Sequence, residues 1–182
     1  MPDQDSLLSA QGRCFPFDDR GSGYGRGEGV AVVALKRVAD AVRDGDSIRA
    51  VIRGSGLCQD GRTRGITLPN PLAQSDMINE TYHRAGLDPR ETAYVEAHGT
   101  GTAAGDMAEI QALHASYCTQ RDTASSLLVG SIKGNIGHLE ATSGLAGLIK
   151  TILILERGII PGTAGIQKLK EELRLQERNI KV

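Results

Sequence analysis

Aromatic side chains are scarce in this sequence: they make up 3% of its 182 residues, and tryptophan is absent. Proteins that bind single-stranded nucleic acids stack bases on aromatic rings, so this scarcity argues against that class. A formal net charge of -1 also provides no basic surface for duplex DNA or for an anionic membrane. We therefore expect the partner to be a small or carrier-bound substrate, with no nucleic acid and no membrane involved.

Cysteine is sparse, and long apolar runs are missing. Cys14, Cys58 and Cys118 are far apart and never form a Cys-x-x-Cys pair, so no disulfide framework is indicated. No charged-then-apolar leader opens the chain. The longest apolar stretch, residues 145–155, is interrupted by Lys150 and is shorter than the roughly 20 residues that cross a bilayer. A reducing, cytoplasmic location is the default expectation.

Nucleotide-binding and metal-binding patterns are absent as well. No Gly-x-Gly-x-x-Gly can be placed over the glycine-rich stretches, and no Gly-Lys-Ser/Thr of a phosphate-binding loop occurs. His114 and Cys118 are four residues apart on an expected helix, but nothing nearby completes a tetrahedral metal site. We expect these two residues to belong to the core, with no metal and no directly bound cofactor.

What is present is an alternation of strand-like and helix-like segments. Apolar, β-branched runs predict strands at residues 30–35, 48–57, 92–97 and 127–132, with a last strand-like run at 180–182. Helical periodicity predicts helices at residues 38–43, 73–85, 106–117 and 142–157, and a helix-prone stretch at 167–177. This alternation is typical of a mostly parallel, layered α/β fold.

The helix at 142–157 has the strongest pattern. Thr142 or Ser143 can cap its beginning, and Gly158 is the expected stop. Its apolar surface extends beyond one stripe, so we expect it to be buried on more than one side.

Two histidines follow predicted strands in glycine-rich loops. His98 closes the strand at 92–97, and His138 follows the strand at 127–132. Open α/β sheets bind ligands at the carboxyl ends of their strands. Neutral imidazoles placed there can stabilise an oxygen that gains negative charge, or move protons near pH 7. The alternative is that they are two unrelated loop histidines that are merely hydrogen-bonded.

Polar neighbours of these histidines are further candidates. Lys133 and Glu140 flank His138 and could form a charge pair that orients the imidazole, although they could also be a solvated surface pair. Thr100 and Thr102 offer hydroxyls suited to a polar tether such as a phosphopantetheine arm; ordinary turn residues are the alternative. Glycines in both loops permit positive φ angles or a close approach to a ligand.

At this point the residues resemble a known family, the β-ketoacyl synthases. The likeness lies in Glu96-Ala-His-Gly-Thr-Gly-Thr-x-x-Gly-Asp-x-x-Glu109 and in Gly130-Ser-Ile-Lys-x-Asn-Ile-Gly-His-Leu-Glu-Ala141. Three shorter motifs match in the same order: Phe17-Asp, Gly23-Tyr-Gly-Arg-Gly-Glu-Gly29 and Asp60-Gly-Arg62. The resemblance spans about residues 9–182 and is strongest to ketosynthase domains of polyketide synthases of the large, iterative fungal kind.

The resemblance implies a thiolase-like, layered αβαβα fold of which only the later part is present, incomplete at both ends. It divides residues 1–182 into an irregular start at 1–10, a motif-bearing α/β core at 11–160 and a polar tail at 161–182 that leads out of the domain. It also implies decarboxylative Claisen condensation of an acyl thioester with a malonyl unit. The expected partners are an acyl carrier protein with its phosphopantetheine arm, the remaining ketosynthase half, other synthase domains, and a second copy in a homodimer of the full enzyme.

By motif position, the resemblance implies a role for each candidate residue. His98 and His138 would stabilise the enolate oxygen and assist decarboxylation, and Lys133 and Glu140 would be their supporting pair. Thr100 and Thr102 would contact the pantetheine arm. The loops that carry these side chains would be shaped by Gly99, Gly101, Asn135 and Gly137.

The cysteine that such enzymes acylate is not visible. In the family it lies in a Thr-Ala-Cys-Ser-Ser segment upstream of Gly-Tyr-Gly-Arg-Gly-Glu-Gly, and this sequence begins downstream of that segment. Cys14 occupies a different family position, and Cys58 and Cys118 lack the strand-to-helix elbow that activates a thiol. We therefore expect the histidine half of the site, without stand-alone condensation. Two alternatives remain: a non-catalytic remnant that binds a carrier protein or synthase partner, and a fatty-acid synthase ketosynthase.

Overall fold

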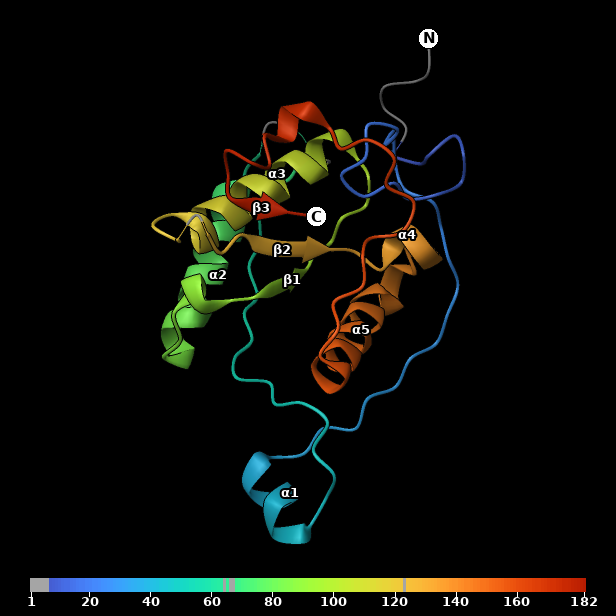
Figure 1. Ribbon diagram of the computed structural model, residues 1–182. Helices are drawn as coiled ribbons and strands as arrows, with labels where there is room; N and C mark the ends of the chain where they lie inside the picture. The colour runs from blue at the N-terminus through green and yellow to red at the C-terminus, as the bar shows by residue number, and fades with distance from the viewer. Residues whose placement is uncertain (1–6, 64, 66–67, 123) are drawn as a thin grey trace.

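A sheet of three parallel strands lies at the centre of the molecule (Figure 1). The computed structural model describes residues 7–63, 65, 68–122 and 124–182. The strands are β1 (Tyr94–Glu96), β2 (Leu127–Gly130) and β3 (Ile180–Lys181), in the order β1-β2-β3. Tyr94 is opposite Leu128, and Leu127 is opposite Ile180. The expected parallel α/β arrangement is therefore present, with strands shorter than the sequence predicted.

The two faces of this sheet are covered by different helices. Alternate residues of β2, Leu127 and Val129, join the buried core beside α3 (Ala103–Leu113). The opposite face meets α5 (Ser143–Arg157), where Gly147 packs against Glu96 of β1. Since side chains alternate between the faces of a strand, this burial pattern places a helix on each side of β1 and β2.

Local capping signals account for where most helices begin and end. Asn70 caps α2 (Pro71–Ala85), and glycines in the left-handed conformation end α1 (Val38–Asp44), α2 and α5. The helix expected at 106–117 is α3 followed by a π-helical turn, His114–Cys118. Ser143 begins α5, but neither expected capping side chain accepts a backbone hydrogen bond there. The remaining helical elements are α4 (Lys133–Ile136) and 3-10 turns at Pro89–Glu91, Glu140–Thr142 and Glu171–Leu173.

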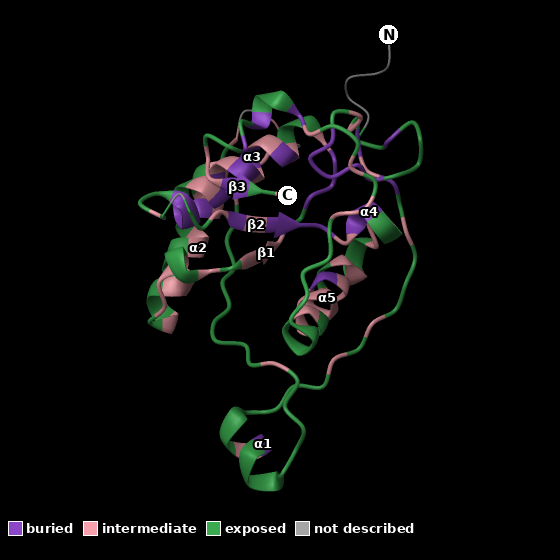
Figure 2. Cartoon of the chain, viewed as in Figure 1, coloured by how far each residue is buried: buried purple, intermediate pink, exposed green. Residues whose placement is uncertain are grey.

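The strands expected at 30–35 and 48–57 are not formed, so this prediction is wrong for the described chain. Both segments are non-helical, unpaired chain that carries α1 away from the sheet (Figure 1). Figure 2 shows most of their length as exposed. Their β-branched composition is a local preference, whereas a strand also requires a neighbouring strand to pair with.

The segment 161–182 was expected to be a polar tail leaving the domain, but it packs back onto the core. Leu173, Leu175 and Ile180 belong to the buried cluster, and β3 extends the sheet. The helix expected at 167–177 is reduced to the 3-10 turn Glu171–Leu173. Burial of these apolar side chains required the segment to fold back across α3 rather than to form a continuous helix.

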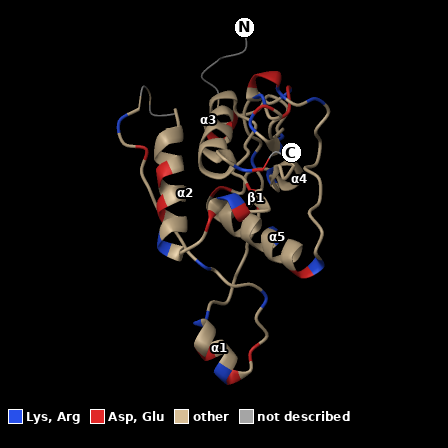
Figure 3. Ribbon diagram, turned by 60° about the vertical axis from the view of Figure 1, so that its left-hand side comes forward, with Lys and Arg blue, Asp and Glu red and all other residues tan. Residues whose placement is uncertain are grey.

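The burial expected for α5 on several sides is also wrong. Gly147 is its one buried residue, and Leu155 is 65% exposed. Charged side chains of both signs are interspersed along α1, α2 and α5 (Figure 3), in keeping with the net charge of -1. None of the helices in the described part of the chain is both long and apolar enough to cross a membrane.

Candidate functional site

Two imidazole rings meet beyond the carboxyl ends of neighbouring strands. The ring centroids of His98 and His138 are 5.2 Å apart, and the ring planes are inclined by 83°. His98 lies two residues after the end of β1, and His138 follows β2 and the short helix α4. The sequence predicted that both would lie at this sheet edge; their edge-to-face contact is a finding of the tertiary structure.

His138 is held by a glycine-rich segment from far away in the chain. Its backbone N–H donates to Gly25 O at 2.8 Å, and its carbonyl accepts from Gly27 N at 2.9 Å. Gly27 has to be glycine here, because a Cβ at this position would lie 2.1 Å from the Ile136 carbonyl oxygen. The ring of Tyr24 packs beside the imidazole at 5.1 Å. The alternating glycines at 21–29 therefore position His138.

The loop that carries His98 is held by a carboxylate of α3. Glu109 accepts hydrogen bonds from His98 N at 2.6 Å and Gly99 N at 2.8 Å. Gly99 has φ = 43°, and a Cβ there would lie 2.7 Å from Ser131 Cβ. The two strand ends can thus approach each other only with glycine at this position.

A second carboxylate from the same helix supports the other end of this loop. Asp106 is fully buried and accepts from Gly101 N and Phe17 N, both at 3.0 Å. Lys170 forms a buried ion pair with it at 3.2 Å. The roles of Asp106 and Glu109 were not assigned from the sequence. Their spacing of three residues, which places both on one helix face, was the signal that could have indicated them.

The environment of the rings keeps both imidazoles neutral. Removal from water and the nearby Lys133 ammonium lower the pKa of His98 to about 4, although His98 lies at the exposed edge of the site. Burial and Lys133 also lower the pKa of His138, with Glu140 opposing them. His138 Nδ1 accepts from Glu140 N at 2.9 Å. The proton of the neutral ring therefore resides on Nε2, which is a hydrogen-bond donor.

Lys133 and Glu140 do not form the expected pair. Lys133 is 5% exposed, and burial lowers its pKa while the carboxylates of Glu109 and Glu96 act in the opposite direction. Glu140 is exposed, and its carboxylate lies 3.9 Å from Arg26. Glu140 contacts His138 through its backbone N–H. The separation arises because α4 buries Lys133, whereas the following 3-10 turn points the Glu140 side chain outward.

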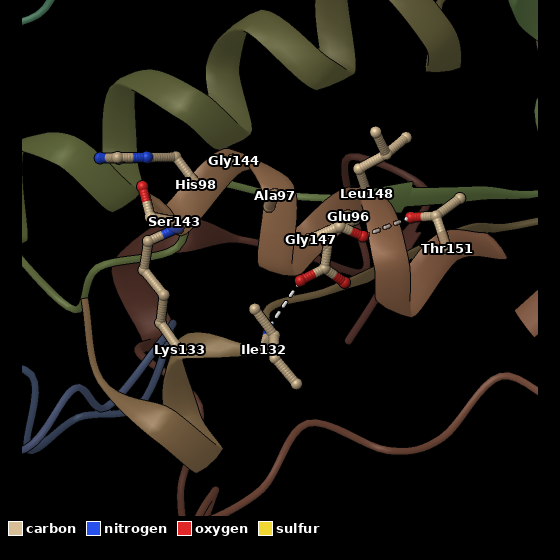
Figure 4. Close-up of a pocket in the computed structure, with 10 residues that line it drawn as sticks. All are labelled: Glu96, Ala97, His98, Ile132, Lys133, Ser143, Gly144, Gly147, Leu148 and Thr151. Atoms are coloured by element: carbon tan, nitrogen blue, oxygen red, sulfur yellow. Dashed lines mark hydrogen bonds between the residues drawn. The ribbon is translucent and has the colours of Figure 1, made fainter. Parts of the chain in front are cut away.

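Glu96 is a site residue whose role the sequence analysis missed. It lines a cavity of about 410 Å³ together with His98 and Lys133, and Figure 4 shows these side chains around it. Its carboxylate accepts from Ile132 N at 2.6 Å and forms an ion pair with Lys150 of α5 at 2.7 Å. Glu96 therefore ties β1 to α5 and to the residue that precedes Lys133.

The remaining candidate residues do not line the cavity. Thr100 is buried, and its hydroxyl lies 3.1 Å from that of Thr102; neither residue is among the ten that line the cavity. Gly101 and Gly137 have positive φ angles, and Asn135 is exposed on α4.

No described residue group provides a metal site. Among residues 7–63, 65, 68–122 and 124–182, no three His, Cys, Asp or Glu side chains lie close enough to hold an ion. Cys118 is buried in the core, as predicted, whereas His114 is half-buried outside the core cluster, with Nδ1 3.0 Å from Arg178 O.

Comparison with known proteins gives the same family that the motifs suggested. The family model described as "Beta-ketoacyl synthase, C-terminal domain" matches residues 49–167, and the corresponding N-terminal domain model matches residues 2–41. The highly reducing polyketide synthase AFT9-1 of Alternaria alternata is 54% identical over 176 residues. The highly reducing polyketide synthase sdnO of Sordaria araneosa is 52% identical over the same length. Each match covers 97% of this chain and 6% of the relative.

Solved ketosynthases have the same fold over this region. The oxazolomycin ketosynthase domain OzmH KS7 of Streptomyces albus JA3453 superposes with a TM-score of 0.90 at 38% identity. That match covers 96% of this chain and 30% of the solved chain. The module 6 ketosynthase of the Bacillus subtilis 168 bacillaene synthase gives a TM-score of 0.86 at 38% identity, covering 91% and 30%. The fold is thus a portion of the thiolase-like ketosynthase fold, and the chain belongs to the β-ketoacyl synthase family.

Proposed function

We propose that this chain supplies the histidine half of a polyketide-type ketosynthase site, which catalyses decarboxylative condensation of an acyl thioester with a malonyl unit on a carrier protein. The observation that carries the proposal is the contact between His98 and His138, whose neutral rings converge beside the Lys133 ammonium. Such a group of donors is suited to an oxygen that becomes negatively charged during a reaction.

The chemistry requires such donors at one step. When the malonyl unit loses CO2, the bond between its carboxylate carbon and its α-carbon breaks, and the electron pair passes to the thioester carbonyl as an enolate. A ring N–H of His98 and the Nε2–H of His138 donate hydrogen bonds to that oxygen. The enolate carbon then attacks the acyl thioester, and the thiolate of the acylated cysteine leaves. Because both rings are neutral near pH 7, they stabilise the enolate without protonating it fully.

The other residues have supporting roles in this proposal. Burial keeps both imidazoles in the neutral form, Lys133 adds a positive field that acts in the same direction, and Glu140 aligns His138 through its backbone N–H. Thr100 and Thr102 contact the phosphopantetheine arm of an acyl carrier protein. The full enzyme is a homodimer that works with further synthase domains, and the cytoplasmic setting expected from the unpaired cysteines is part of the same proposal.

The acylated cysteine comes from a portion of ketosynthase other than this chain. Burial raises the pKa of the thiols of Cys14 and Cys118, the opposite of the shift that activates a nucleophile. Cys58 is exposed, in a stretch of chain outside the helices and strands. The 182-residue chain alone is therefore expected to hold the decarboxylation machinery without a site for acyl transfer.

The test is an assay of the purified chain for acyl loading and for decarboxylation of a malonyl-carrier protein, alone and with the cysteine-bearing part of a relative's ketosynthase. We expect no acylation of the chain alone, and decarboxylation in the mixture that falls at least about 100-fold in His98→Ala and His138→Ala. Robust covalent acylation of the isolated chain contradicts the proposal.

The non-catalytic alternative makes a different prediction in the same experiment. A remnant that only binds a carrier protein or a synthase partner retains that binding in both alanine variants and shows no decarboxylation in the mixture. The fatty-acid alternative is disfavoured by the relatives, since those reported above are polyketide synthases.

A further inference from the structure

The carboxylate of Glu96, at the end of β1, is held by donors on both of its oxygens. One oxygen accepts a hydrogen bond from Ile132 N at 2.6 Å, where α4 begins. The other lies 2.7 Å from Lys150 Nζ of α5 and also accepts from the hydroxyl of Tyr94. Tyr94 and Glu96 are two residues apart on β1, so their side chains project from the same face of the sheet. Together these donors give the carboxylate one defined orientation.

This cluster of Glu96, Lys150 and Tyr94 differs from a surface ion pair. The side chains of Glu96 and Lys150 are 9% and 10% exposed, and Lys150 Nζ lies 5.5 Å from the centroid of the Tyr94 ring. Burial, together with the hydrogen bond to Glu96, raises the pKa of Tyr94, so its hydroxyl keeps the proton that it donates. Charges removed from water to this extent are screened little by salt. The carboxylate can therefore act on neighbouring charges.

Lys133 is the neighbouring charged group. It follows Ile132 directly and lines the same cavity as Glu96 and His98 (Figure 4). It is 5% exposed, and burial lowers the pKa of its ammonium, whereas the carboxylates of Glu109 and Glu96 oppose that change. The titratable groups in its surroundings are the Glu96–Lys150 pair of β1 and α5, Glu109 of α3, the imidazoles of His98 and His138, and the thiol of Cys14.

The two carboxylates near Lys133 are bonded to different parts of the backbone. Glu109 accepts from His98 N and Gly99 N, so it holds the loop after β1. Glu96 accepts from the residue before Lys133, so it holds the loop after β2 at the point where the lysine side chain leaves the backbone. Glu96 is therefore placed to fix Lys133 as well as to offset its buried charge.

We infer that Glu96 is a positioning residue for Lys133: its carboxylate holds the start of α4 and serves as the counter-charge that keeps the buried ammonium in place beside the histidine rings. Lys150 and Tyr94 orient the carboxylate for this role. The part that Lys133 then plays in catalysis rests on the proposed function, whereas the effect of Glu96 on Lys133 does not. The alternative is a purely structural tie, in which the ion pair only fastens α5 to β1.

NMR titration of the full chain, isotopically labelled in its lysines, tests the inference directly. The Lys133 signal is identified by its loss in Lys133→Met, and its titration is followed as the pH is raised from about 7. The decisive comparison is between Lys150→Met and Glu96→Gln/Lys150→Met. Both lack the ion pair that ties α5 to β1, and they differ only in the charge at residue 96. Glutamine also retains an oxygen that can accept from Ile132 N.

We expect Lys133 to lose its proton at least about one pH unit lower in Glu96→Gln/Lys150→Met than in Lys150→Met, because the buried ammonium has lost a nearby counter-charge. Glu96→Gln and the unsubstituted protein form a second pair that differs in the same charge, and the same direction is expected there. Equal Lys133 titrations within each pair would overturn the inference and leave Glu96 as a structural tie.

Decarboxylation by the mixture with the cysteine-bearing part of a relative's ketosynthase gives an independent measurement. The rate should decline at lower pH in Glu96→Gln/Lys150→Met than in Lys150→Met, because Lys133 becomes neutral as the pH rises through its lowered pKa and its positive field disappears. The same alkaline pH profile in both variants would contradict the inference and leave the proposed function intact. If no mixture decarboxylates, the proposed function fails, and the NMR titration alone decides the inference.

Discussion

Lys133 reinforces the effect of burial on the protonation of the histidine pair, from a position that the sequence alone does not reveal. Its ammonium is buried beside carboxylates of β1 and α3, and it disfavours a second positive charge on either ring. Burial of the rings acts in the same direction and is the larger effect for both. The imidazoles are consequently available as neutral hydrogen-bond donors across the physiological pH range.

Replacing Lys133 by Met should raise the pKa values of both histidines, and that of His98 should rise above about 4. Since the folded pKa of His98 lies below its value in the unfolded chain, its contribution to stability is complete above about pH 6.5 and declines as the pH falls toward 4. Lys133→Met should make that decline smaller. NMR titration of the imidazole protons measures the shifts, and Lys168→Met, at an exposed lysine remote from the rings, should leave them unchanged.

Removing one partner of the ion pair between Glu96 and Lys150 should destabilise the protein, whereas removing both partners should cost little stability. The side chains of the pair are 9% and 10% exposed, so Glu96→Gln leaves an uncompensated ammonium in a poorly hydrated position. We expect a loss of about 3 kcal/mol in the free energy of unfolding, with most of it recovered in the double variant Glu96→Gln/Lys150→Met. Urea unfolding measures both. A loss below about 0.5 kcal/mol in the single variant would show that the pair does not hold α5 to β1.

At the scale of elements, the site depends on how closely the loops after β1 and β2 approach each other. Ser131 Oγ donates to Gly99 O at 3.2 Å, and the Gly25–Gly27 segment pairs with the backbone of His138. Each imidazole is thus fixed by its loop backbone, and the contact between the rings follows from the distance between the loops.

Gly99→Ala should separate the two loops. The added methyl group would lie 2.7 Å from Ser131 Cβ, in addition to the strain of a positive φ. Gly86→Ala, at the end of α2, is the matched control: φ is also positive, but nothing lies within 4 Å of the new atom. We expect Gly99→Ala to lower the free energy of unfolding by about 1–3 kcal/mol more than Gly86→Ala does. Gly99→Ala should also abolish the nuclear Overhauser effect between the rings of His98 and His138. Equal losses of unfolding free energy in the two variants would show that the close approach of the loops does not contribute to stability.

At the scale of the whole molecule, buried carboxylates join segments that are distant in sequence. Asp18 is fully buried and accepts hydrogen bonds from Gln167 N at 2.5 Å, Lys168 N at 3.0 Å and the Arg20 side chain. Burial alone would raise its pKa, but these donors outweigh burial and hold the pKa well below its ordinary value. With the Asp106–Lys170 pair, this contact draws residues 165–170 against the first part of the chain.

Acid should therefore loosen the C-terminal segment from the body. A carboxylate with a depressed folded pKa contributes stability that is present above about pH 4 and is lost as the pH falls through its folded value. Asp18→Asn should lower stability at pH 7 and reduce its dependence on pH between about 4 and 2. Asp19→Asn, at an exposed neighbour, is the control. Chemical unfolding at several pH values measures the stability of both variants. If Asp18→Asn loses stability in acid as the unsubstituted protein does, other carboxylates are responsible for that loss.

The sequence by itself determined the family, the parallel α/β character and the positions of the main helices. The signals for these features are local: Asn70 and Pro71 begin α2, and Gly86 and Gly158 stop α2 and α5. It also placed His98 and His138 at strand ends. The tertiary structure decided what depends on a distant partner. The strand-like segments 30–35 and 48–57 remain unpaired because a strand needs a neighbour. Glu140 does not contact Lys133, because α4 turns the Lys133 side chain inward and the next turn directs the Glu140 side chain outward.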